Sequence, residues 1–206
     1  MSNLSLKIAV IDDHKLTHAG LNLLFDKQPD YNIVAQFNSG LDFLAYLATS
    51  TVDIVLLDLG LPDISGVNLL TELIGREDMT VIIVTGENKP NTFDYALKMG
   101  VRAIVSKSDP IETIVRAIDH ARLGEIYMSP TISNQLKGYK APDINLSPRQ
   151  MGILHLLCEG HTNKEIGYRL NISAPTVTFH ITEIRKKIGV KSNQQILSRA
   201  RDLQLL

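Results

Sequence analysis

Cysteine is nearly absent from this chain, and so are the features that mark secreted and membrane proteins. Cys158 is the single cysteine among 206 residues, which excludes an intrachain disulfide and is typical of a reducing compartment. No run approaches the roughly 18 apolar residues that a membrane helix needs. Residues 1–7 lack the basic and then apolar layout of a signal peptide. We therefore expect a cytoplasmic protein that does not enter a membrane.

The usual motifs for nucleotide and metal chemistry are also missing. The chain has no glycine-rich phosphate loop, so direct use of ATP is not supported. Its six histidines are scattered without the spacing of a metal-binding motif. Any chemistry must therefore come from other residue types.

Positive and negative charges are unevenly distributed, although the formal net charge is only -1. Residues 1–137 contain 11 Lys and Arg against 17 Asp and Glu, whereas residues 138–206 contain 10 against 5. The two parts therefore have net charges of -6 and +5. This asymmetry favours a cation as ligand of the first part and a polyanion as partner of the second.

Strand-like and helix-like segments alternate over the first 123 residues. Five apolar segments are expected as strands, and each is followed by a segment with helical periodicity. The expected strands are LKIAVI, YNIVAQF, VDIVLLD, TVIIVT and RAIVS, and the expected helices span about 15–27, 41–48, 67–75, 92–99 and 110–123. Five such units predict an α/β fold, a doubly wound five-stranded parallel sheet with helices on both faces.

The last third of the chain differs, because each of its periodic segments is helical. Helices expected at about 148–158, 163–170, 174–188 and 193–203 predict a second, small all-α domain. The segment before them loses the alternation and is interrupted by glycine and proline, which indicates a linker. We expect a first domain over residues 1–125, a linker over 126–145 and a second domain over 146–206.

Acidic side chains end two neighbouring strands of the expected sheet. Asp12 and Asp13 follow the first strand, and Asp58 ends the third. Because the carboxyl ends of parallel strands form the crevice in which open sheets bind ligands, the three carboxylates are expected to lie together. Carboxylates this close repel one another unless a cation compensates, and oxygen ligands favour Mg²⁺. The pattern predicts a magnesium site.

A hydroxyl and an ammonium group follow two further strands at the same edge. Thr85 ends the fourth strand and Lys107 follows the fifth. Lysine can pair with one phosphoryl oxygen, and threonine can donate a hydrogen bond to another. With Mg²⁺, these groups suit in-line transfer of a phosphoryl group onto a carboxylate. Asp58 is the candidate nucleophile. Each residue alone is ordinary at a strand end, so it is the combination that indicates function.

The basic C-terminal domain contains a helix-turn-helix pattern. Apolar residues at 177, 181, 184 and 188 recur at spacings of four, three and four, which marks one buried stripe. A shorter helix and a turn precede this helix, so it is suited to enter the major groove of DNA. A generic helical bundle with a solvated basic face is the alternative. The residues expected to contact bases or phosphates are Lys164, Thr176, Thr178, Phe179, His180, Thr182, Arg185, Lys186, Lys187 and Lys191.

Both parts resemble known domains. Residues 6–123 resemble the receiver domain of two-component response regulators through the motifs IDDH, LLDLGLPDISG, VIIVTG and VSKSDP. Residues 146–206 resemble the LuxR-type helix-turn-helix over LSPRQMGILHLLCEGHTNKEIGYRLNISAPTVTFHITEIRKKIGVKSNQQI. Together they resemble the NarL/FixJ family of response regulators. The resemblance implies a flavodoxin-like receiver joined to a DNA-binding module, in a transcription regulator that is not an enzyme.

The resemblance also implies partners and ligands. A partner histidine kinase would phosphorylate Asp58, and the threonine and lysine at the strand ends would contact the phosphoryl group. Asp13, Asp58 and the carbonyl oxygen of Gly60 would bind Mg²⁺, with Asp12 acting through water. The protein would bind double-stranded DNA as a homodimer on paired half-sites.

The sequence departs from this family at several positions, including Gly86, where alanine is common. Ile104 stands where receivers usually have Tyr or Phe, and Thr178 and Thr182 stand where the recognition helix often has lysine. Phe179 either touches a thymine methyl or packs partly within the module. A phosphorylation-independent regulator or a protein-binding adaptor therefore remains an alternative. A Mg²⁺-dependent phosphohydrolase is disfavoured, because its second acid would fall at Gly60.

Overall fold

The structure is a computed structural model that describes residues 5–74, 76, 78–139, 144–203 and 205. The chain divides into two compact units. The first comprises Met1–Pro90 and Gly100–Gly138, and the second comprises Asn91–Met99 and Tyr139–Leu206. A parallel sheet organises the first unit, and the part of the second unit that the structure describes is helical.

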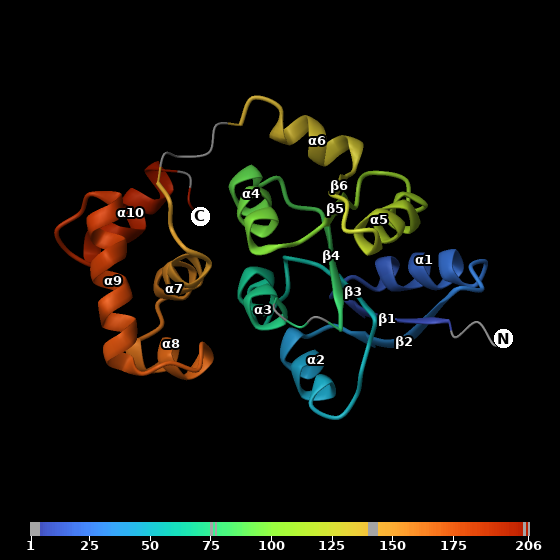
Figure 1. The fold of residues 1–206 in the computed structure, drawn as a ribbon, viewed down its shortest axis with the longest axis horizontal. Helices are drawn as coiled ribbons and strands as arrows, with labels where there is room; N and C mark the ends of the chain where they lie inside the picture. The colour runs from blue at the N-terminus through green and yellow to red at the C-terminus, as the bar shows by residue number, and fades with distance from the viewer. Residues whose placement is uncertain (1–4, 75, 77, 140–143, 204, 206) are drawn as a thin grey trace. The chain divides into compact units, whose positions relative to one another are not determined.

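The sheet of the first unit has six parallel strands in the described residues (Figure 1). The order places β1 beside β3, and the two strands are in register from Ile8 with Ile54 to Ile11 with Leu57. Their carboxyl ends therefore reach the same edge, and the predicted parallel α/β fold is confirmed. In sheet order the strands are β2 (Tyr31–Phe37), β1 (Leu6–Ile11), β3 (Ile54–Leu57), β4 (Thr80–Thr85), β5 (Ala103–Ser106) and β6 (Tyr127–Met128).

The prediction of five strands is wrong by one, because β6 extends the sheet beyond β5. Ile104 pairs with Met128, and the amide of Ser106 donates to Ser129 Oγ at 3.0 Å. These contacts provide partners for backbone groups that β5 would otherwise expose at the sheet edge. A strand of two residues has no periodicity, so sequence patterns do not reveal it.

Part of the segment expected to be a linker is also folded. Helix α6 (Pro130–Leu136) follows β6 directly, and Ile132 within it is fully buried. The hydroxyl of Thr131 donates to the Asp109 carboxylate at 2.7 Å, and its amide donates to the same carboxylate at 3.2 Å. Residues 140–143 of the expected linker lie outside the described residues.

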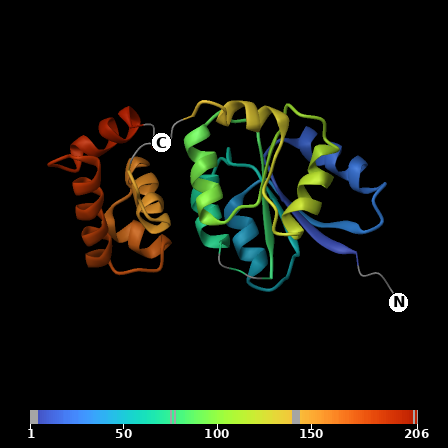
Figure 2. The ribbon, with the colours of Figure 1, turned by 45° about the horizontal axis from the view of Figure 1, so that its top comes forward.

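Helices cover both faces of the sheet (Figures 1 and 2). Helices α1 (Lys15–Phe25) and α5 (Thr113–Arg122) lie on one face, and α2 (Gly40–Leu47) and α3 (Gly66–Leu73) lie on the other. Alternate residues of the central strands form one buried cluster with α1 and α5, because side chains alternate along a strand. Burial on both faces explains why the strands are continuous apolar runs.

The sequence located the start of α4 to within two residues and missed the start of α5 by three. Helix α4 (Pro90–Met99) connects β4 to β5 in the chain. Helix α5 begins at Thr113 and not at the predicted Pro110, because the Thr113 amide donates to the Pro110 carbonyl at 2.9 Å and closes a turn first.

Among the described residues, no helix is both long and apolar enough to cross a membrane.

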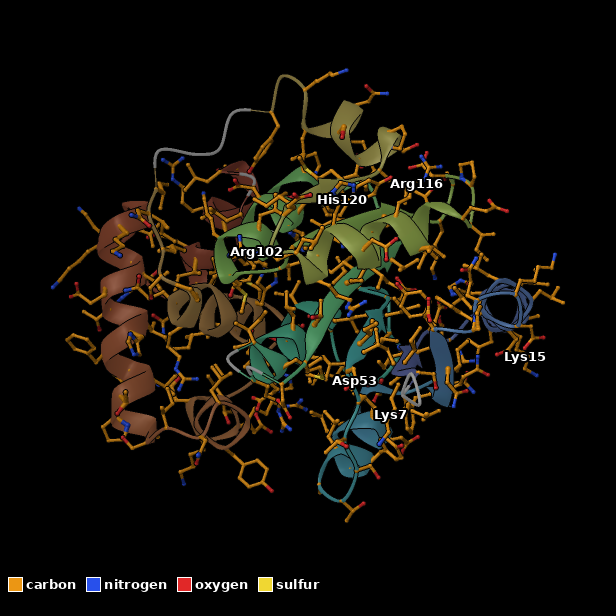
Figure 3. The ribbon with its side chains drawn as sticks, turned by 45° about the vertical axis from the view of Figure 1, so that its right-hand side comes forward. Lys7, Lys15, Asp53, Arg102, Arg116 and His120 are labelled. Atoms are coloured by element: carbon orange, nitrogen blue, oxygen red, sulfur yellow. The ribbon has the colours of Figure 1, made fainter. Side chains whose placement is uncertain are left out.

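Asp53 ties the amino ends of β1 and β3 together. Its carboxylate accepts a hydrogen bond from the Lys7 amide at 2.7 Å, and its own amide donates to the Lys7 carbonyl at 2.9 Å. Figure 3 labels both residues at this edge of the sheet. The two strands therefore start together and end together at the opposite edge.

The second unit contains the four helices expected from the C-terminal sequence. They are α7 (Pro148–Cys158), α8 (Asn163–Arg169), α9 (Ala174–Ile188) and α10 (Gln194–Asp202). Ser147 and Thr162 begin α7 and α8 with capping boxes, and α9 ends at Gly189 in the left-handed conformation, with φ 75. The predicted apolar stripe of α9 is buried.

The turn between α8 and α9 is unusually close to α8. A Cβ at Gly167 would lie 2.6 Å from the carbonyl oxygen of Ile172. Only glycine therefore permits this approach, and the two helices form the predicted helix-turn-helix.

Candidate functional site

Two of the predicted acids are buried side by side at the carboxyl edge of the sheet. Asp12 is 2% exposed and Asp58 is 4% exposed. Their backbones extend the strands, because the Asp12 amide donates to the Phe37 carbonyl and the Asp58 amide donates to the Ile11 carbonyl, both at 2.9 Å. Asp13 lies at the rim of the same pocket, with 35% of its side chain exposed. The sequence correctly placed all three acids at one edge.

Lys107 bridges the two buried carboxylates. Its Nζ lies 2.7 Å from Asp12 Oδ2 and 2.6 Å from Asp58 Oδ2. Burial disfavours the charged ammonium, but hydrogen bonds and charge attraction from the two aspartates outweigh it and raise the pKa of Lys107. The lysine is therefore a fixed positive charge within the pocket.

His14 also lies in the pocket; its place beside the acid pair was evident from the sequence, but no role followed for it. Its Nδ1 is 2.7 Å from Asp13 Oδ1 and 3.1 Å from Asp12 Oδ1. Nearby, His18 Nε2 lies 2.7 Å from the carbonyl oxygen of Asp12. The adjacency of His14 to the acid pair was the available signal, but its approach depends on how the chain turns after β1.

The loop after Asp58 is held close to the carboxylate. The Gly60 amide lies 3.3 Å from Asp58 Oδ1 as a hydrogen-bond donor. The Gly66 amide donates to the Leu59 carbonyl at 3.1 Å and closes the loop. A Cβ at Gly66 would lie 2.4 Å from Leu59 Cα. A side chain at that position would therefore displace the backbone next to Asp58.

Asp63 anchors the far side of this loop to the start of α2. Its carboxylate accepts bonds from the Ser39 hydroxyl at 2.8 Å, the Leu41 amide at 2.9 Å and the Gly40 amide at 3.1 Å. Burial opposes its ionisation, but these bonds outweigh it and lower the pKa of Asp63. Sequence patterns missed this residue because its partners lie more than twenty residues away.

Thr85 and Ile104 occupy neighbouring strands and are both fully buried. Thr85 ends β4, where its hydroxyl accepts a bond from the Glu87 amide at 3.0 Å and its carbonyl accepts one from the Lys107 amide at 2.8 Å. Ile104 lies in β5 opposite Ile83 of β4. Thr85 is therefore positioned beside Lys107 by its backbone, and the neighbouring position has an aliphatic side chain.

The pocket fits a hard divalent cation. Ligand atoms of Asp12, Asp13, His14 and Asp58 all lie within 4.8 Å of one another. Three of the four residues offer carboxylate oxygens, which are the ligands that Mg²⁺ prefers. One lysine cannot balance three carboxylates, so a cation would offset the remaining negative charge.

The expected base-contacting residues lie along α9. Phe179 is 61% exposed. The hydroxyl groups of Thr178 and Thr182 donate to helix carbonyls four residues earlier, at 3.1 and 3.0 Å. The hydroxyl groups of Thr176 and Ser173 lie 2.8 Å apart at the start of the helix.

The expected phosphate-contacting residues fall into two groups. Lys164 and Lys191 are exposed. Lys187 instead donates to the Asn145 carbonyl at 2.7 Å and to Gln150 Oε1 at 2.8 Å, and so joins α9 to the start of α7.

The remaining two cations also have partners within the unit. Lys186 pairs with Glu183 at 2.7 Å, and Arg185 donates to the Lys191 carbonyl at 3.3 Å. His180 is half-buried, and its Nδ1 is buried with no hydrogen-bond partner among the described residues.

Taken together, these features define a class of protein. A doubly wound parallel sheet with two buried carboxylates bridged by a lysine at its carboxyl edge is a receiver domain. The second unit adds a helix-turn-helix whose longer helix exposes polar and aromatic side chains. The chain is thus a response regulator with two domains.

Comparison with known families agrees with this class. The family described as "Response regulator receiver domain" matches residues 8–119, and that described as "Bacterial regulatory proteins, luxR family" matches residues 144–200. The chain belongs to the NarL/FixJ family of response regulators.

Several characterised proteins are similar over nearly the whole chain. The transcriptional regulatory protein UhpA of Escherichia coli is 31% identical, over 96% of this chain and 98% of its own. The nitrate/nitrite response regulator NarL of the same species is 29% identical, over 90% of each. The structure of RcsB from Salmonella enterica serovar Typhimurium bound to promoter rprA has a TM-score of 0.65 at 23% identity, covers 95% of this chain and 98% of RcsB, and supports the fold.

Proposed function

We propose that the protein is phosphorylated on Asp58 by a partner histidine kinase and controls transcription by binding double-stranded DNA through α9. The bridge from Lys107 to the buried carboxylates of Asp12 and Asp58 is the observation that supports the first part most strongly. We assign residues 1–125 to the receiver and residues 146–206 to the DNA-binding domain, and we place the protein in the cytoplasm, where both partners occur.

The transfer uses Asp58 as nucleophile. A carboxylate oxygen attacks the phosphorus of a phosphohistidine and forms a P–O bond as the P–N bond breaks. The electron pair of the broken bond remains on the imidazole nitrogen, which takes up a proton. Lys107 already lies 2.6 Å from an Asp58 oxygen, so its ammonium can pair with an oxygen of the transferred group. Thr85 is proposed to donate its hydroxyl hydrogen to another oxygen.

Mg²⁺ is proposed as the cofactor of this pocket. Asp13, Asp58 and the Gly60 carbonyl would hold the ion, and Asp12 would act through a bound water. When bound, the ion would neutralise part of the negative charge of the carboxylates and the phosphoryl group. His14 lies within reach of the same cluster and orients Asp13.

On DNA we propose a homodimer whose two α9 helices occupy adjacent major grooves. Helix-turn-helix dimers bind half-sites about one helical turn apart. The exposed cations Lys164 and Lys191 are suited to phosphate contacts, and the first two turns of α9 are suited to base contacts.

The deciding experiment measures DNA binding by the full-length protein across a genomic fragment library. Binding is compared with and without acetyl phosphate and Mg²⁺, for the wild type, Asp58→Asn and the control Asp26→Asn, which changes an exposed acid after α1. We expect the phosphodonor to strengthen binding to defined fragments in the wild type and the control, but not in Asp58→Asn.

Two other outcomes would point to different functions. Specific binding that is indifferent to both the donor and Asp58→Asn would indicate a phosphorylation-independent regulator, consistent with the aliphatic Ile104. Failure to retain any fragment would indicate a protein-binding adaptor.

A further inference from the structure

We propose that α9 recognises thymine methyl groups through an apolar surface formed by Pro175, Thr178, Phe179 and Thr182, here called the α9 apolar patch. The proposal rests on the DNA-binding function proposed above and concerns which bases the helix selects. It depends on which hydrogen-bonding and apolar groups in the first two turns of α9 are still free to contact a ligand.

The four residues of the α9 apolar patch share one side of the helix. Spacings of three and four residues place side chains on the same helical face. The buried stripe of Val177, Ile181, Ile184 and Ile188 is displaced by about a third to half a turn from them and packs into the unit. The patch therefore faces away from the core of the helical unit.

The hydroxyl group of Thr178 is already used within the protein. It donates its hydrogen to the Ala174 carbonyl at 3.1 Å and accepts a hydrogen bond from Asn163 Nδ2 at 2.9 Å. A hydroxyl has one hydrogen and two lone pairs. Thr178 therefore cannot donate to a base, and its methyl group is the main remaining contact.

The hydroxyl group of Thr182, one turn later, is also already hydrogen-bonded within the protein. Its hydroxyl donates to the Thr178 carbonyl at 3.0 Å and accepts from Arg185 Nη2 at 3.4 Å. It too has no hydrogen left for a base acceptor. Toward a ligand, each of these two residues therefore offers a methyl group and one remaining lone pair, and neither can donate a hydrogen bond.

Phe179 supplies most of the apolar area. Its side chain is 61% exposed, although its ring approaches the His180 ring edge-on at 5.6 Å between centroids. More than half of the ring therefore faces outward, although its edge contacts the module. The exposed ring is available to an apolar group of a partner.

A cationic side chain borders this surface at its C-terminal end, where Arg185 Nη2 donates to Thr182 Oγ1 at 3.4 Å. The first turns of the helix carry none. Residues 174–184 contain no lysine or arginine, so the bidentate contacts by which these residues recognise guanine are not available there. Glu183, the acid in this segment, is held by Lys186 at 2.7 Å. The C5-methyl of thymine is the apolar group that the major-groove edges present, which makes it the matching target.

The test removes that methyl group without changing base pairing. Full-length protein is used to select a binding site from a random DNA library, and each thymine of the selected half-site is then replaced by deoxyuridine. We expect at least one replacement to weaken binding about three- to fivefold, as the loss of one buried methyl predicts. Binding is measured by fluorescence anisotropy at fixed salt.

Two variants locate the contact on the protein. Phe179→Ala should weaken binding to the thymine site and abolish the further loss caused by deoxyuridine at the sensitive position. Tyr168→Ala is the matched control, because Tyr168 is an exposed aromatic residue of α8, 90% exposed and outside the patch. It should retain the full deoxyuridine effect. If Phe179→Ala does not fold, the effect of deoxyuridine on binding by the wild-type protein is sufficient to test the proposal.

The outcomes separate this proposal from the general function. If the protein selects a defined site but no deoxyuridine replacement weakens binding, the thymine proposal is overturned and DNA binding stands. A selected site rich in guanine contacts with no thymine would overturn it in the same way. If no site is selected at all, the DNA-binding function fails, and the thymine proposal fails with it.

Discussion

At the scale of single residues, Lys107 determines whether Asp12 and Asp58 can both be buried as carboxylates. The two side chains are 3% and 4% exposed, and the lysine Nζ is within 2.7 Å of each. Removing one partner of a buried ionic group leaves uncompensated charge, which costs far more than breaking an exposed pair. The same lysine therefore supports both the fold of the pocket and its chemistry.

Lys107→Met should lower the free energy of unfolding by about 3 kcal/mol, because two buried carboxylates lose their counter-charge. Added Mg²⁺ should restore part of this loss by replacing the missing positive charge. Urea unfolding with and without Mg²⁺ measures both effects. In the control, Lys89→Met breaks an exposed pair with Glu87 and should cost at most about 1 kcal/mol. Equal losses in the two variants would contradict the role assigned to Lys107.

The residues of the pocket show what a sequence can predict at this scale. Asp12, Asp58 and Lys107 were predictable because each directly follows a strand, and parallel strands end at one edge. His14 and Asp63 were not, because their contacts depend on the path of loops. The hydrogen bonds of the Thr178 and Thr182 hydroxyl groups also escaped prediction, since the sequence does not show which partner a hydroxyl takes.

At the scale of secondary-structure elements, the loop between β3 and α3 depends on the start of α2. Asp63 accepts three hydrogen bonds there, from Ser39, Gly40 and Leu41. A Cβ at Gly40 would lie 2.4 Å from Ile64 Cγ2, so the loop also packs directly on the helix start. The loop that follows Asp58 is thus held at both ends.

Asp63→Asn should lower the free energy of unfolding at pH 7 by about 1 kcal/mol, as loss of a capping carboxylate does. Because the pKa of Asp63 is lowered in the folded protein, its contribution is present above its ordinary value of 3.8 and is lost as the pH falls through the folded value. The difference between wild type and variant should therefore shrink below pH 3.8. Urea unfolding across pH tests this.

Asp42, an exposed acid at the start of α2, provides the control for the Asp63 experiment. Asp42→Asn changes a residue in the first turn of α2 and should give a smaller loss at pH 7. If Asp63→Asn shows the same loss at every pH, the carboxylate charge of Asp63 does not stabilise the loop.

The packing of helix α9 against the start of α7 depends on Lys187. Lys187 and Lys164 of α8 are both exposed, but the Lys187 ammonium group also donates to the Asn145 carbonyl and to Gln150 Oε1. Lys187→Met should lower the stability of the helical unit by about 1 to 2 kcal/mol and leave the salt dependence of DNA binding unchanged. Lys164→Met should do the reverse and reduce the salt slope by about one.

Each of these two variants serves as the control for the other. Thermal unfolding and DNA binding at several salt concentrations are measured for both. A reduced salt slope in Lys187→Met would show that this lysine reaches the DNA backbone after all.

The elements themselves were largely predictable, and the exceptions have physical causes. Long periodic segments such as α9 were located because a buried stripe recurs at helical spacing. The start of α5 was missed because Pro110 begins a turn and not the helix. Strand β6 was missed because two residues form a strand only when the edge of β5 offers them partners.

At the scale of the whole molecule, the chain joins an acidic unit to a basic one. The net charges of -6 over residues 1–137 and +5 over residues 138–206 favour the cation proposed for the first part and the polyanion proposed for the second. The proposed homodimer is a property of the complete chain and is tested on it.

Beryllofluoride with Mg²⁺, a mimic of the phosphorylated state, should shift the full-length protein from monomer toward dimer. Asp58→Asn should not respond, and chelation of Mg²⁺ by EDTA should return the wild type to monomer. Sedimentation equilibrium measures the mass directly. Persistence of the monomer while a full two-half-site DNA is still bound would contradict the proposed homodimer.

Strand β6 has a consequence for how two such molecules can meet. An exposed edge strand invites a strand of another chain to continue the sheet. Here the outward-facing backbone of β5 is already engaged, by Tyr127 and Ser129 amides and by the Ser129 hydroxyl. A second copy therefore cannot pair with β5. The new edge strand, β6, has only two residues, and the Met128 carbonyl already accepts from the Ser133 hydroxyl at 3.2 Å. Association on that side therefore has to rely mainly on side chains. Such a contact can be altered one residue at a time without disturbing the sheet beneath it.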